Sequence, residues 1–231
     1  MEIIMSELEE SYQFHVVEKF VSINGEGKKA GQLAVFIRLQ GCNLNCSYCD
    51  TRWANDIGCE FIPMTANEIV QYVLECKVEN VTLTGGEPLL NRNVSILLKA
   101  LTDANLFVEI ETNGSVSLED FVGISERITF TMDYKLPSSR MEKSMCVSNF
   151  KLLQEKDTVK FVAGNIDDLQ RAKRVIEEHH LTGKCNIYIS PVYGKIDPKD
   201  IVNFMIHHHL NKVNLQLQLH KFIWDPNEKG V

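Results

Sequence analysis

Two periodicities of hydrophobic residues alternate along the chain. Short runs rich in β-branched and aromatic residues predict strands, whereas longer segments with apolar residues three and four positions apart predict helices. The predicted strands cover residues 33–39, 81–84, 107–111, 127–132, 158–162, 186–189 and 213–219. The predicted helices cover residues 65–77, 93–103, 118–122, 145–154, 165–180 and 199–209. Strands that alternate with helices predict parallel strands joined by crossover helices, and therefore an α/β fold.

The number of predicted units limits the architecture. A closed barrel of eight strand–helix units takes about 250 residues, and this chain of 231 residues shows only about six units. We therefore expect a partial α/β barrel. No internal repeat, low-complexity segment or linker divides the sequence, so residues 1–231 are predicted to form a single domain, with residues 1–15 as an N-terminal lead-in.

The charge and composition narrow the class of function. The chain has 24 Lys and Arg against 31 Asp and Glu, a formal net charge of −7, and neutralising nucleic-acid phosphates requires a basic surface. No segment reaches the roughly 20 apolar residues that span a bilayer. The first ten residues contain four Glu and no Lys or Arg, which is not typical of a signal peptide. We therefore expect a cytoplasmic protein that binds neither nucleic acid nor a membrane.

The seven cysteines indicate metal chemistry. An odd number of cysteines without a secretion signal argues against a disulfide framework. Cys42, Cys46 and Cys49 form a C-x3-C-x2-C cluster, and three thiolates on one short loop can converge on a metal centre. Structural zinc normally takes four protein ligands, whereas a 4Fe–4S cluster held by three cysteines leaves one iron open. Buried thiols, or a zinc site completed by a distant residue, remain the alternatives.

Polar or glycine-containing segments follow five of the predicted strands. Ligands bind at the carboxyl ends of the strands in parallel α/β folds, so we expect these segments to share one rim. They are residues 42–49, 84–88, 109–114, 133–135 and 190–193. Taken alone, segments 84–88 and 109–114 are also plausible turns or helix starts, and Asp133 and Lys135 could be solvated charges at a strand end. Their occurrence together with the cysteine cluster favours a binding site.

The cysteine cluster and the Thr84-Gly85-Gly86-Glu87-Pro88 segment resemble the radical S-adenosylmethionine (SAM) superfamily. The resemblance implies a partial (β/α)6 barrel in which Cys42, Cys46 and Cys49 hold a 4Fe–4S cluster. It also implies that SAM binds the open iron and is cleaved reductively to a 5′-deoxyadenosyl radical. The cluster and SAM would carry the reaction, and no further catalytic side chain is assigned.

A second resemblance covers nearly the whole chain. Residues 20–27 (FVSINGEG), 36–38 (FIR), 49–51 (CDT) and 218–221 (QLHK) are similar to the 7-carboxy-7-deazaguanine synthase family. This resemblance implies conversion of 6-carboxy-5,6,7,8-tetrahydropterin to 7-carboxy-7-deazaguanine with loss of ammonia, in the biosynthesis of queuosine and other 7-deazapurines. The glycyl-radical enzyme activases are the alternative within the superfamily, and a non-catalytic iron–sulfur or zinc protein is the alternative outside it.

The resemblance also implies where the substrate binds. The residues at the corresponding substrate positions are Ile23, Asn24, Gly25, Glu26, Arg38 and Thr84. Arg38 would pair with the substrate carboxylate, a role that suits a planar bidentate donor. Asn24 stands where the family usually has Gln, so its contact with the ring would be shorter or mediated by water. Thr51 corresponds to a ligand of a Mg2+ ion that bridges to the substrate.

The positions implied for SAM come from four segments. They are Tyr48, Gly86, Glu87, Asp133, Tyr134, Lys135, Ser190, Pro191, Val192 and Tyr193. Asp133 and Tyr134 depart from the Ser-Pro-Lys segment of many members, and only Lys135 is shared. The family also implies an electron donor such as flavodoxin or ferredoxin and a homodimer. His220 is predicted to end the last strand at the same rim.

Overall fold

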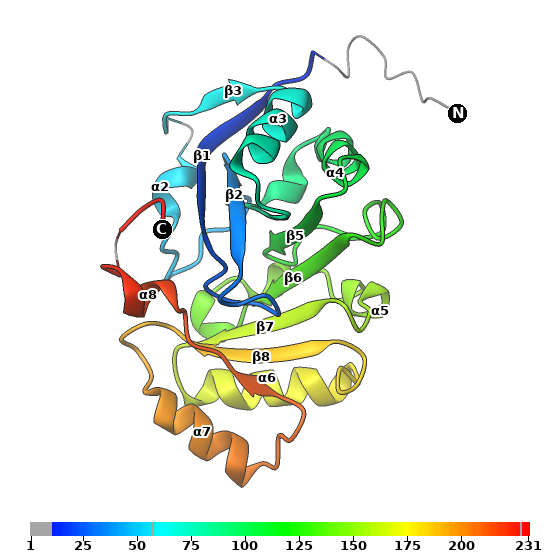
Figure 1. Ribbon diagram of the computed structural model, residues 1–231. Coiled ribbons are helices and arrows are strands. Elements are labelled where there is room, and N and C mark those ends of the chain that lie inside the picture. Colours follow the sequence, from blue (N-terminus) through cyan, green and yellow to red (C-terminus); the bar gives the residue numbers. More distant parts are fainter. Residues whose placement is uncertain (1–10, 57, 227) are drawn as a thin grey trace.

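The protein is a mixed α/β fold built on one open sheet (Figure 1). The structure, a computed structural model, describes residues 11–56, 58–226 and 228–231. In these residues the sheet has nine strands in the order β3-β1-β2-β4-β5-β6-β7-β8-β9. Their bounds are β1 Phe14–Ile23, β2 Leu33–Leu39, β3 Ile62–Met64, β4 Asn80–Gly85, β5 Phe107–Thr112, β6 Ile128–Tyr134, β7 Thr158–Ala163, β8 Asn186–Pro191 and β9 Asn214–Leu215.

The strands from β2 through β9 follow the predicted parallel arrangement, except for the short edge strand β3. Each of β4 to β9 pairs in parallel with its neighbour, while β1 pairs antiparallel with β2 and β3. The strand direction turns from upright in β1 and β2 to horizontal in β7 and β8 (Figure 1). The predicted α/β class with a partial barrel is therefore confirmed, since the sheet is strongly twisted but not closed.

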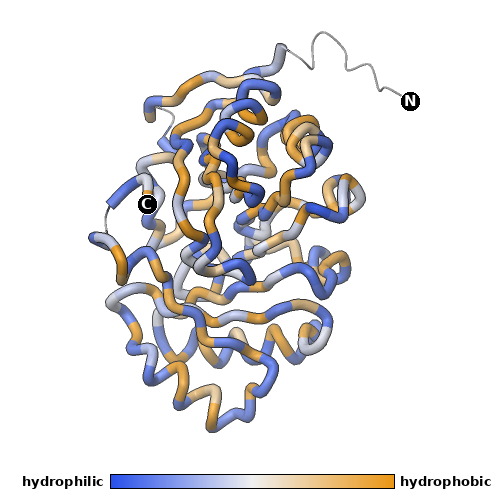
Figure 2. Tube along the Cα trace, viewed as in Figure 1, coloured by the Kyte–Doolittle hydropathy of each residue, from blue (hydrophilic) through white to orange (hydrophobic). Residues whose placement is uncertain are grey.

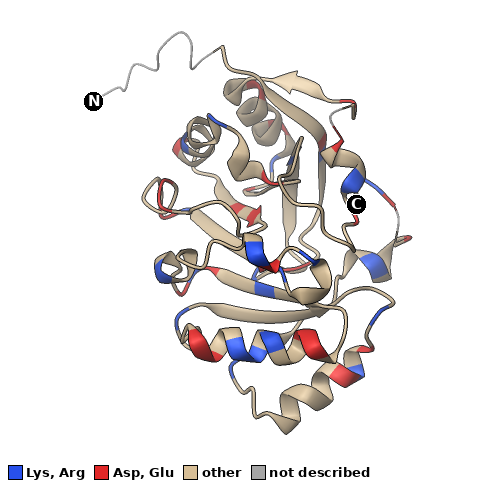
Figure 3. Ribbon diagram, turned by 180° about the vertical axis from the view of Figure 1, so that it is seen from behind, with Lys and Arg blue, Asp and Glu red and all other residues tan. Residues whose placement is uncertain are grey.

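Helices cover one face of the sheet. The α-helices are α2 Arg52–Asn55, α3 Ala66–Cys76, α4 Val94–Asp103, α5 Asn149–Leu152, α6 Ile166–Glu178, α7 Pro198–His207 and α8 His220–Ile223. Three 3-10 helices complete the described elements: η1 Pro88–Leu90, η2 Pro137–Ser139 and η3 Glu142–Ser144. The long helix α6 carries charged residues of both signs along its length (Figure 3), while its Leu169 and Val175 are fully buried.

The two faces of the sheet carry opposite chemistry. Apolar residues of the strands, such as Ile37, Leu83 and Val159, pack with helix residues in a single hydrophobic core. Because successive side chains of a strand point to opposite faces, the intervening positions face the other way, and many of these are polar. Figure 2 shows the resulting alternation of hydrophobic and hydrophilic residues along the strands. The polar face is the one that positions the candidate site.

Several sequence predictions differ from the structure. Strand β1 was not predicted, and it begins inside the expected lead-in of residues 1–15, of which residues 1–10 lie outside the described part of the chain. Residues 118–122 form turns, with a Phe121 N–H donating to the Leu118 carbonyl at 2.9 Å. The helix predicted at 145–154 shortens to α5, and the last strand shortens to β9. The assignment of residues 1–231 to one domain stays a prediction.

Candidate active site

The cysteine loop follows β2 directly. Cys42, Cys46 and Cys49 are free thiols, of which Cys46 is buried and the other two are half-buried. Amide N–H groups point at two of the sulfurs: Asn113 Nδ2 lies 3.5 Å from Cys42 Sγ, and Asn55 Nδ2 lies 3.7 Å from Cys49 Sγ. Cys42 and Cys49 line a cavity of about 270 Å3. The loop therefore presents sulfur ligands to an open space.

The donor set fits a cluster better than a single metal ion. Structural zinc normally takes four protein ligands, with Zn–S bonds of about 2.3 Å, whereas this loop offers three thiols. An iron–sulfur cluster binds each cysteine through a different iron, so its thiolates lie further apart. Burial raises the pKa of the Cys46 and Cys49 thiols, so binding would release protons from them.

Two glycines bring the end of β4 against the cysteine loop. A side-chain Cβ at Gly86 would lie 2.3 Å from the Gly41 carbonyl oxygen and 2.6 Å from Cys42 Cβ. A Cβ at Gly85 would lie 2.3 Å from the Leu39 carbonyl oxygen. These distances are far below van der Waals contact, so only glycine permits this approach.

Glu87 ties the ends of β4 and β5 together. Its side chain is buried and accepts hydrogen bonds from the Asn113 N–H at 2.6 Å, the Leu89 N–H at 3.0 Å and the Thr112 hydroxyl at 2.9 Å. Burial raises the pKa of this carboxyl group, although the hydrogen bonds oppose the shift. In this structure Glu87 mainly organises the strand ends around the predicted SAM site.

The predicted SAM residues at the end of β6 divide into two kinds. Asp133 Oδ2 lies 3.0 Å from Lys135 Nζ on the polar side. Burial works against the ammonium group, but Asp133 holds the pKa of Lys135 above its ordinary range. Tyr134 instead packs in the core, with its ring centroid 5.6 Å from that of Phe161. The structure therefore brings Asp133 and Lys135 to the site and turns the Tyr134 side chain away from it.

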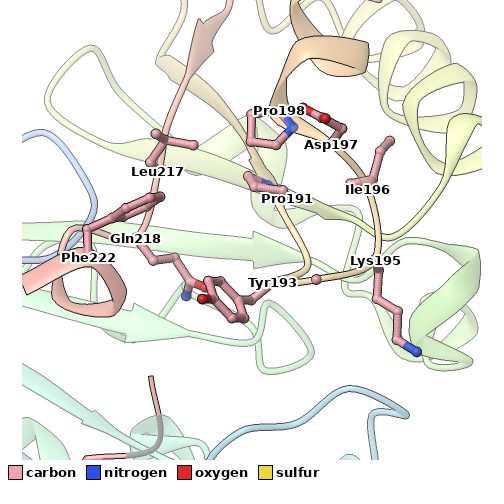
Figure 4. A pocket seen from close by; sticks show the side chains of 10 residues that line it. Pro191, Tyr193, Lys195, Ile196, Asp197, Pro198, Leu217, Gln218 and Phe222 are labelled. Atoms are coloured by element: carbon pink, nitrogen blue, oxygen red, sulfur yellow. The ribbon is translucent and has the colours of Figure 1, made fainter. Parts of the chain in front are cut away.

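The remaining SAM positions lie along β7 and β8. The Tyr48 hydroxyl donates to the Val162 carbonyl at 3.3 Å, which places the cysteine loop against β7. Ser190 is fully buried, whereas Pro191 and Tyr193 line a cavity of about 550 Å3. Figure 4 shows Leu217 and Phe222 of the C-terminal segment on one side of this cavity and residues 195–198 on the other. Val192, next to these lining residues, is buried.

The segment at residues 24–27 is held by contacts from distant parts of the chain. Asn24 is 3% exposed, and its Oδ1 accepts a hydrogen bond from the Thr82 hydroxyl at 2.6 Å. Its Nδ2 has no hydrogen-bond partner among the described residues. The carbonyl of Gly25 accepts the Leu219 N–H at 3.1 Å. Ile23, the end of β1, is half-buried and pairs with Leu33.

His220 belongs to the same region but not to a strand. It begins α8 instead of ending the predicted last strand. A Cβ at Gly25 would lie 2.3 Å from His220 Nδ1, so the imidazole packs directly on this glycine. Burial lowers the pKa of His220.

Arg38 and Thr84 are neighbours across β2 and β4. The parallel register pairs them directly. Arg38 Nε donates to Glu18 Oε2 on β1 at 2.8 Å, so the guanidinium already has one carboxylate partner. Thr84 is buried and hydrogen-bonds to Glu111 of β5. Burial raises the pKa of Glu111. Arg38 and Thr84 are therefore neighbours in the sheet, and each contacts a carboxylate: Glu18 for Arg38 and Glu111 for Thr84.

Thr51 lies beside a carboxylate that the sequence did not single out. Its hydroxyl donates to Asp50 Oδ1 at 2.9 Å, and Asp50 Oδ2 lies 3.3 Å from Lys221 Nζ. Burial alone would raise the pKa of Asp50, but Lys221 and the Thr51 hydroxyl hold it below its ordinary value. Carboxylate and hydroxyl oxygens are the donors that Mg2+ prefers. The pair of Asp50 and Thr51 is therefore a better donor set for this ion than Thr51 alone.

Two charged residues inside the sheet were given no role by the sequence analysis, although Glu109 belongs to the polar segment 109–114. Glu109 of β5 is 6% exposed, accepts the Thr131 hydroxyl at 2.5 Å, and leaves Oε2 without a hydrogen-bond partner in the described residues. Burial raises its pKa to about 7. Lys160 of β7 is also 6% exposed and contacts Glu26. The available signal was the position of each charge within an otherwise apolar predicted strand.

Comparisons with known proteins identify the family of this chain. The profile of the radical SAM superfamily matches residues 36–134. A 7-carboxy-7-deazaguanine synthase from Clostridium acetobutylicum is 58% identical over 219 residues, which are 94% of this chain and 99% of that protein. The chain belongs to the 7-carboxy-7-deazaguanine synthase family. A second member, from Chlorobaculum tepidum, is 38% identical over 94% of this chain and 97% of its own length.

Solved structures support the fold. The crystal structure of QueE from Escherichia coli superposes with a TM-score of 0.72 at 19% identity, covering 93% of this chain and 99% of that chain. Streptococcus suis SuiB superposes over 77% of this chain and 47% of its own with a TM-score of 0.56 at 13% identity. Membership of the 7-carboxy-7-deazaguanine synthase family implies a 4Fe–4S cluster and SAM. In the described ranges, no helix is long and apolar enough to span a membrane.

Proposed function

We propose that this protein converts 6-carboxy-5,6,7,8-tetrahydropterin to 7-carboxy-7-deazaguanine with loss of ammonia. The observation that carries the proposal is the grouping of the three free cysteines, Gly86 and Glu87 at the ends of β2 and β4, beside a polar sheet face. The relatives that match this chain along almost their whole length bear the name of this activity.

The proposed substrate fits the charges of that face. Its carboxylate would bind Arg38, whose Nε donates to Glu18 and whose guanidinium has further N–H donors. Its ring carries N–H donors and carbonyl and nitrogen acceptors, which match Glu111, Thr84 and the unpartnered Asn24 Nδ2. Because buried polar groups of a site must be paired on binding, these residues favour a polar heterocycle over an apolar ligand.

The cofactors would occupy the rim above this face. Cys42, Cys46 and Cys49 would hold the cluster, and Lys135 and Asp133 would meet SAM. When bound, the cluster and SAM supply the radical that removes hydrogen from C6 of the substrate. The role of this chain is to hold the reacting carbon at a fixed place and to exclude water. We further propose that Asp50 and Thr51 bind Mg2+, which would orient the substrate carboxylate.

Three properties outside the site belong to the same proposal. Reduction of the cluster requires an external electron donor, for which flavodoxin or ferredoxin is the natural class. Exposed apolar side chains at Ile206, Phe222 and Ile223 support a homodimer, since such residues are favoured at interfaces. Seven free cysteines support a reducing compartment and therefore the cytoplasm.

The function is tested by anaerobic turnover of the reconstituted protein. The reaction contains SAM, a reductant, Mg2+ and the carboxytetrahydropterin, and the products are identified by mass spectrometry. We expect 7-carboxy-7-deazaguanine from the wild-type protein and none from Cys46→Ala, which should also lose its cluster absorbance. Cys76→Ala, which removes a thiol on α3, serves as the matched control and should keep both. SAM cleavage without this product would refute the substrate assignment, and full activity without iron would refute the cluster.

A further inference from the structure

A buried lysine with no role in the proposed chemistry lies on β7. Lys160 is 6% exposed, and its Nζ is 3.0 Å from Glu26 Oε2 and 3.1 Å from Asp133 Oδ1. The parallel register pairs Asp133 directly with Lys160. The sheet therefore fixes the contact with Asp133, whereas the contact with Glu26 reaches out to a loop.

The ion pairs continue on both sides of Lys160. Asp133 Oδ2 lies 3.0 Å from Lys135 Nζ. On the other side, Glu26 Oε1 accepts a hydrogen bond from the Ser190 hydroxyl at 3.2 Å, and Glu26 Oε2 accepts one from Gln218 Nε2 at 3.3 Å. A continuous network thus connects the loop proposed for the substrate to the strand end proposed for SAM.

The charge balance makes Lys160 the centre of this network. Burial alone would lower the pKa of Lys160, but Asp133, Glu26 and Glu111 raise it well above its ordinary value, so the side chain stays an ammonium ion. Without this positive charge, Glu26 and Asp133 would face each other as poorly solvated carboxylates. Removing one member of a buried ion pair is costly for that reason.

The loop at residues 24–27 depends on such side-chain contacts. Backbone hydrogen bonds hold it at Asn24, whose N–H donates to the Gln32 carbonyl at 2.8 Å, and at Gly25, whose carbonyl accepts the Leu219 N–H at 3.1 Å. Beyond this point Gly27 is held by the side chain of Gln216, which accepts its N–H at 2.9 Å. Glu26, between them, is fixed by Lys160, Ser190 and Gln218. Loss of Lys160 would therefore remove the ion pair that joins Glu26 to β7, while Ser190 and Gln218 would still contact Glu26.

We propose that Lys160 is a positioning residue that sets the separation between the substrate loop and the SAM-facing end of β6. The inference rests on the proposed function for the identity of the two ligands. Lys160 acts through Glu26 and Asp133 and does not itself touch the reacting atoms. A misplacement of about 1 Å can reduce turnover about 100-fold. We therefore expect loss of the Lys160 side chain to reduce turnover by misaligning substrate and SAM, and not only by destabilising the fold.

The test compares Lys160→Met with Lys156→Met. Lys156 lies just before β7 and pairs with Glu126, which is 91% exposed, so it is a matched lysine outside the site. We expect Lys160→Met to raise the KM for the carboxytetrahydropterin about tenfold or more and to lower the product formed per SAM cleaved about fivefold. Lys156→Met should stay within about twofold in both. Lys160→Arg keeps the positive charge and should recover part of the product formed per SAM cleaved.

A structural role alone would lower the amount of folded protein without changing KM or the ratio of product to cleaved SAM. Unchanged values of both in folded Lys160→Met would overturn the inference. If this variant does not fold, Glu26→Gln takes its place, because it removes the loop's charge while keeping a similar shape. Glu26→Gln is then expected to show the same rise in KM and the same loss of coupling, and wild-type values for it would equally overturn the inference.

A separate measurement distinguishes failure of this inference from failure of the proposed function. If wild-type protein and Lys156→Met both give no product, the proposed function is wrong. Lys160 is then judged by equilibrium dialysis of SAM with the reconstituted proteins. We expect Lys160→Met to bind SAM about tenfold more weakly than Lys156→Met, because Asp133 and Lys135 lose their alignment. Equal SAM binding would contradict the proposed coupling.

Discussion

Replacing Glu109 with glutamine measures how much the ionisation of this buried carboxylate reduces the free energy of unfolding. Only the ionisation depends on pH, so a comparison at two pH values separates it from the other effects of the substitution. Glu109 is 6% exposed, and burial raises its pKa from 4.5 to about 7. Between these values the folded protein holds a proton that the unfolded chain has lost, so the free energy of unfolding falls as the pH rises. Above about pH 7 the penalty is complete and no longer changes.

The size of the effect follows from the shift. A difference of 2.5 pH units, from 4.5 to about 7, corresponds to about 3.4 kcal/mol at 1.36 kcal/mol per unit. About 2.5 kcal/mol of this develops between pH 5 and pH 8. Glutamine cannot ionise. The free energy of unfolding of Glu109→Gln, relative to that of wild type, should therefore rise by about 2.5 kcal/mol from pH 5 to pH 8. Any cost of the substitution that does not depend on pH cancels in the comparison.

The assay is the thermal midpoint of the reconstituted proteins at pH 5 and pH 8, measured anaerobically. For a chain of this size, 2.5 kcal/mol corresponds to a shift of about 5–10 °C. Glu119→Gln, which changes an exposed carboxylate within the turns at 118–122, is the matched control and should show almost no pH-dependent difference. If Glu109→Gln and wild type differ by the same amount at both pH values, the pKa of Glu109 is not raised and the reasoning is wrong.

Two further substitutions test the geometry around the cysteine loop. Gly86→Ala would place a Cβ 2.3 Å from the Gly41 carbonyl oxygen. We expect the free energy of unfolding to fall by about 1–3 kcal/mol or more, measured by thermal unfolding, and the bound iron to decrease, measured by iron analysis. Gly123→Ala, with no described atom within 4 Å of the added Cβ, should keep wild-type stability and iron content. Wild-type stability and iron content in Gly86→Ala would contradict the close approach of Gly86 to the cysteine loop. Glu87→Ala would leave the N–H groups of Leu89 and Asn113 without their acceptor. We expect the free energy of unfolding in urea to fall by about 2–5 kcal/mol. A fall of less than about 1 kcal/mol would show that Glu87 does not join the strand ends.

The central strands could be predicted from the sequence because they are nearly continuous apolar runs. The strand predicted at 33–39 coincides with β2, and those predicted for β4 and β5 end within two residues of the observed bounds. Strand β1 was missed because His15, Glu18 and Lys19 interrupt its hydrophobic pattern. The apolar spacing of residues 118–122 resembles a helix, but the structure has turns there.

The cysteine cluster was the most recognisable feature of the candidate site in the sequence, because its spacing is local. The remaining site residues meet only through the tertiary fold. Arg38 faces Thr84 because of the parallel register of β2 and β4, and its ion pair with Glu18 depends on the unpredicted strand β1. The contact of Lys160 with Glu26 joins residues 134 positions apart. No local pattern could indicate that contact.

Tyr134 shows that a family motif does not by itself tell which of its side chains points toward a ligand. It stands at a position implied for SAM, but alternation along β6 places its side chain on the helix-covered face next to Phe150 and Phe161. Its neighbours Asp133 and Lys135 point to the other face and form an ion pair there. Side-chain direction along a strand therefore decides which residues of a motif can reach a ligand.

The central claim is tested most directly by measuring ammonia and 7-carboxy-7-deazaguanine in the same anaerobic reaction. The reconstituted wild-type protein is given SAM, a reductant, Mg2+ and 6-carboxy-5,6,7,8-tetrahydropterin, and both products are quantified over time. The proposed reaction forms them in equal amounts, and only when substrate, SAM and cluster are all present. Cleavage of SAM with neither product, or consumption of the pterin without 7-carboxy-7-deazaguanine, would contradict the account.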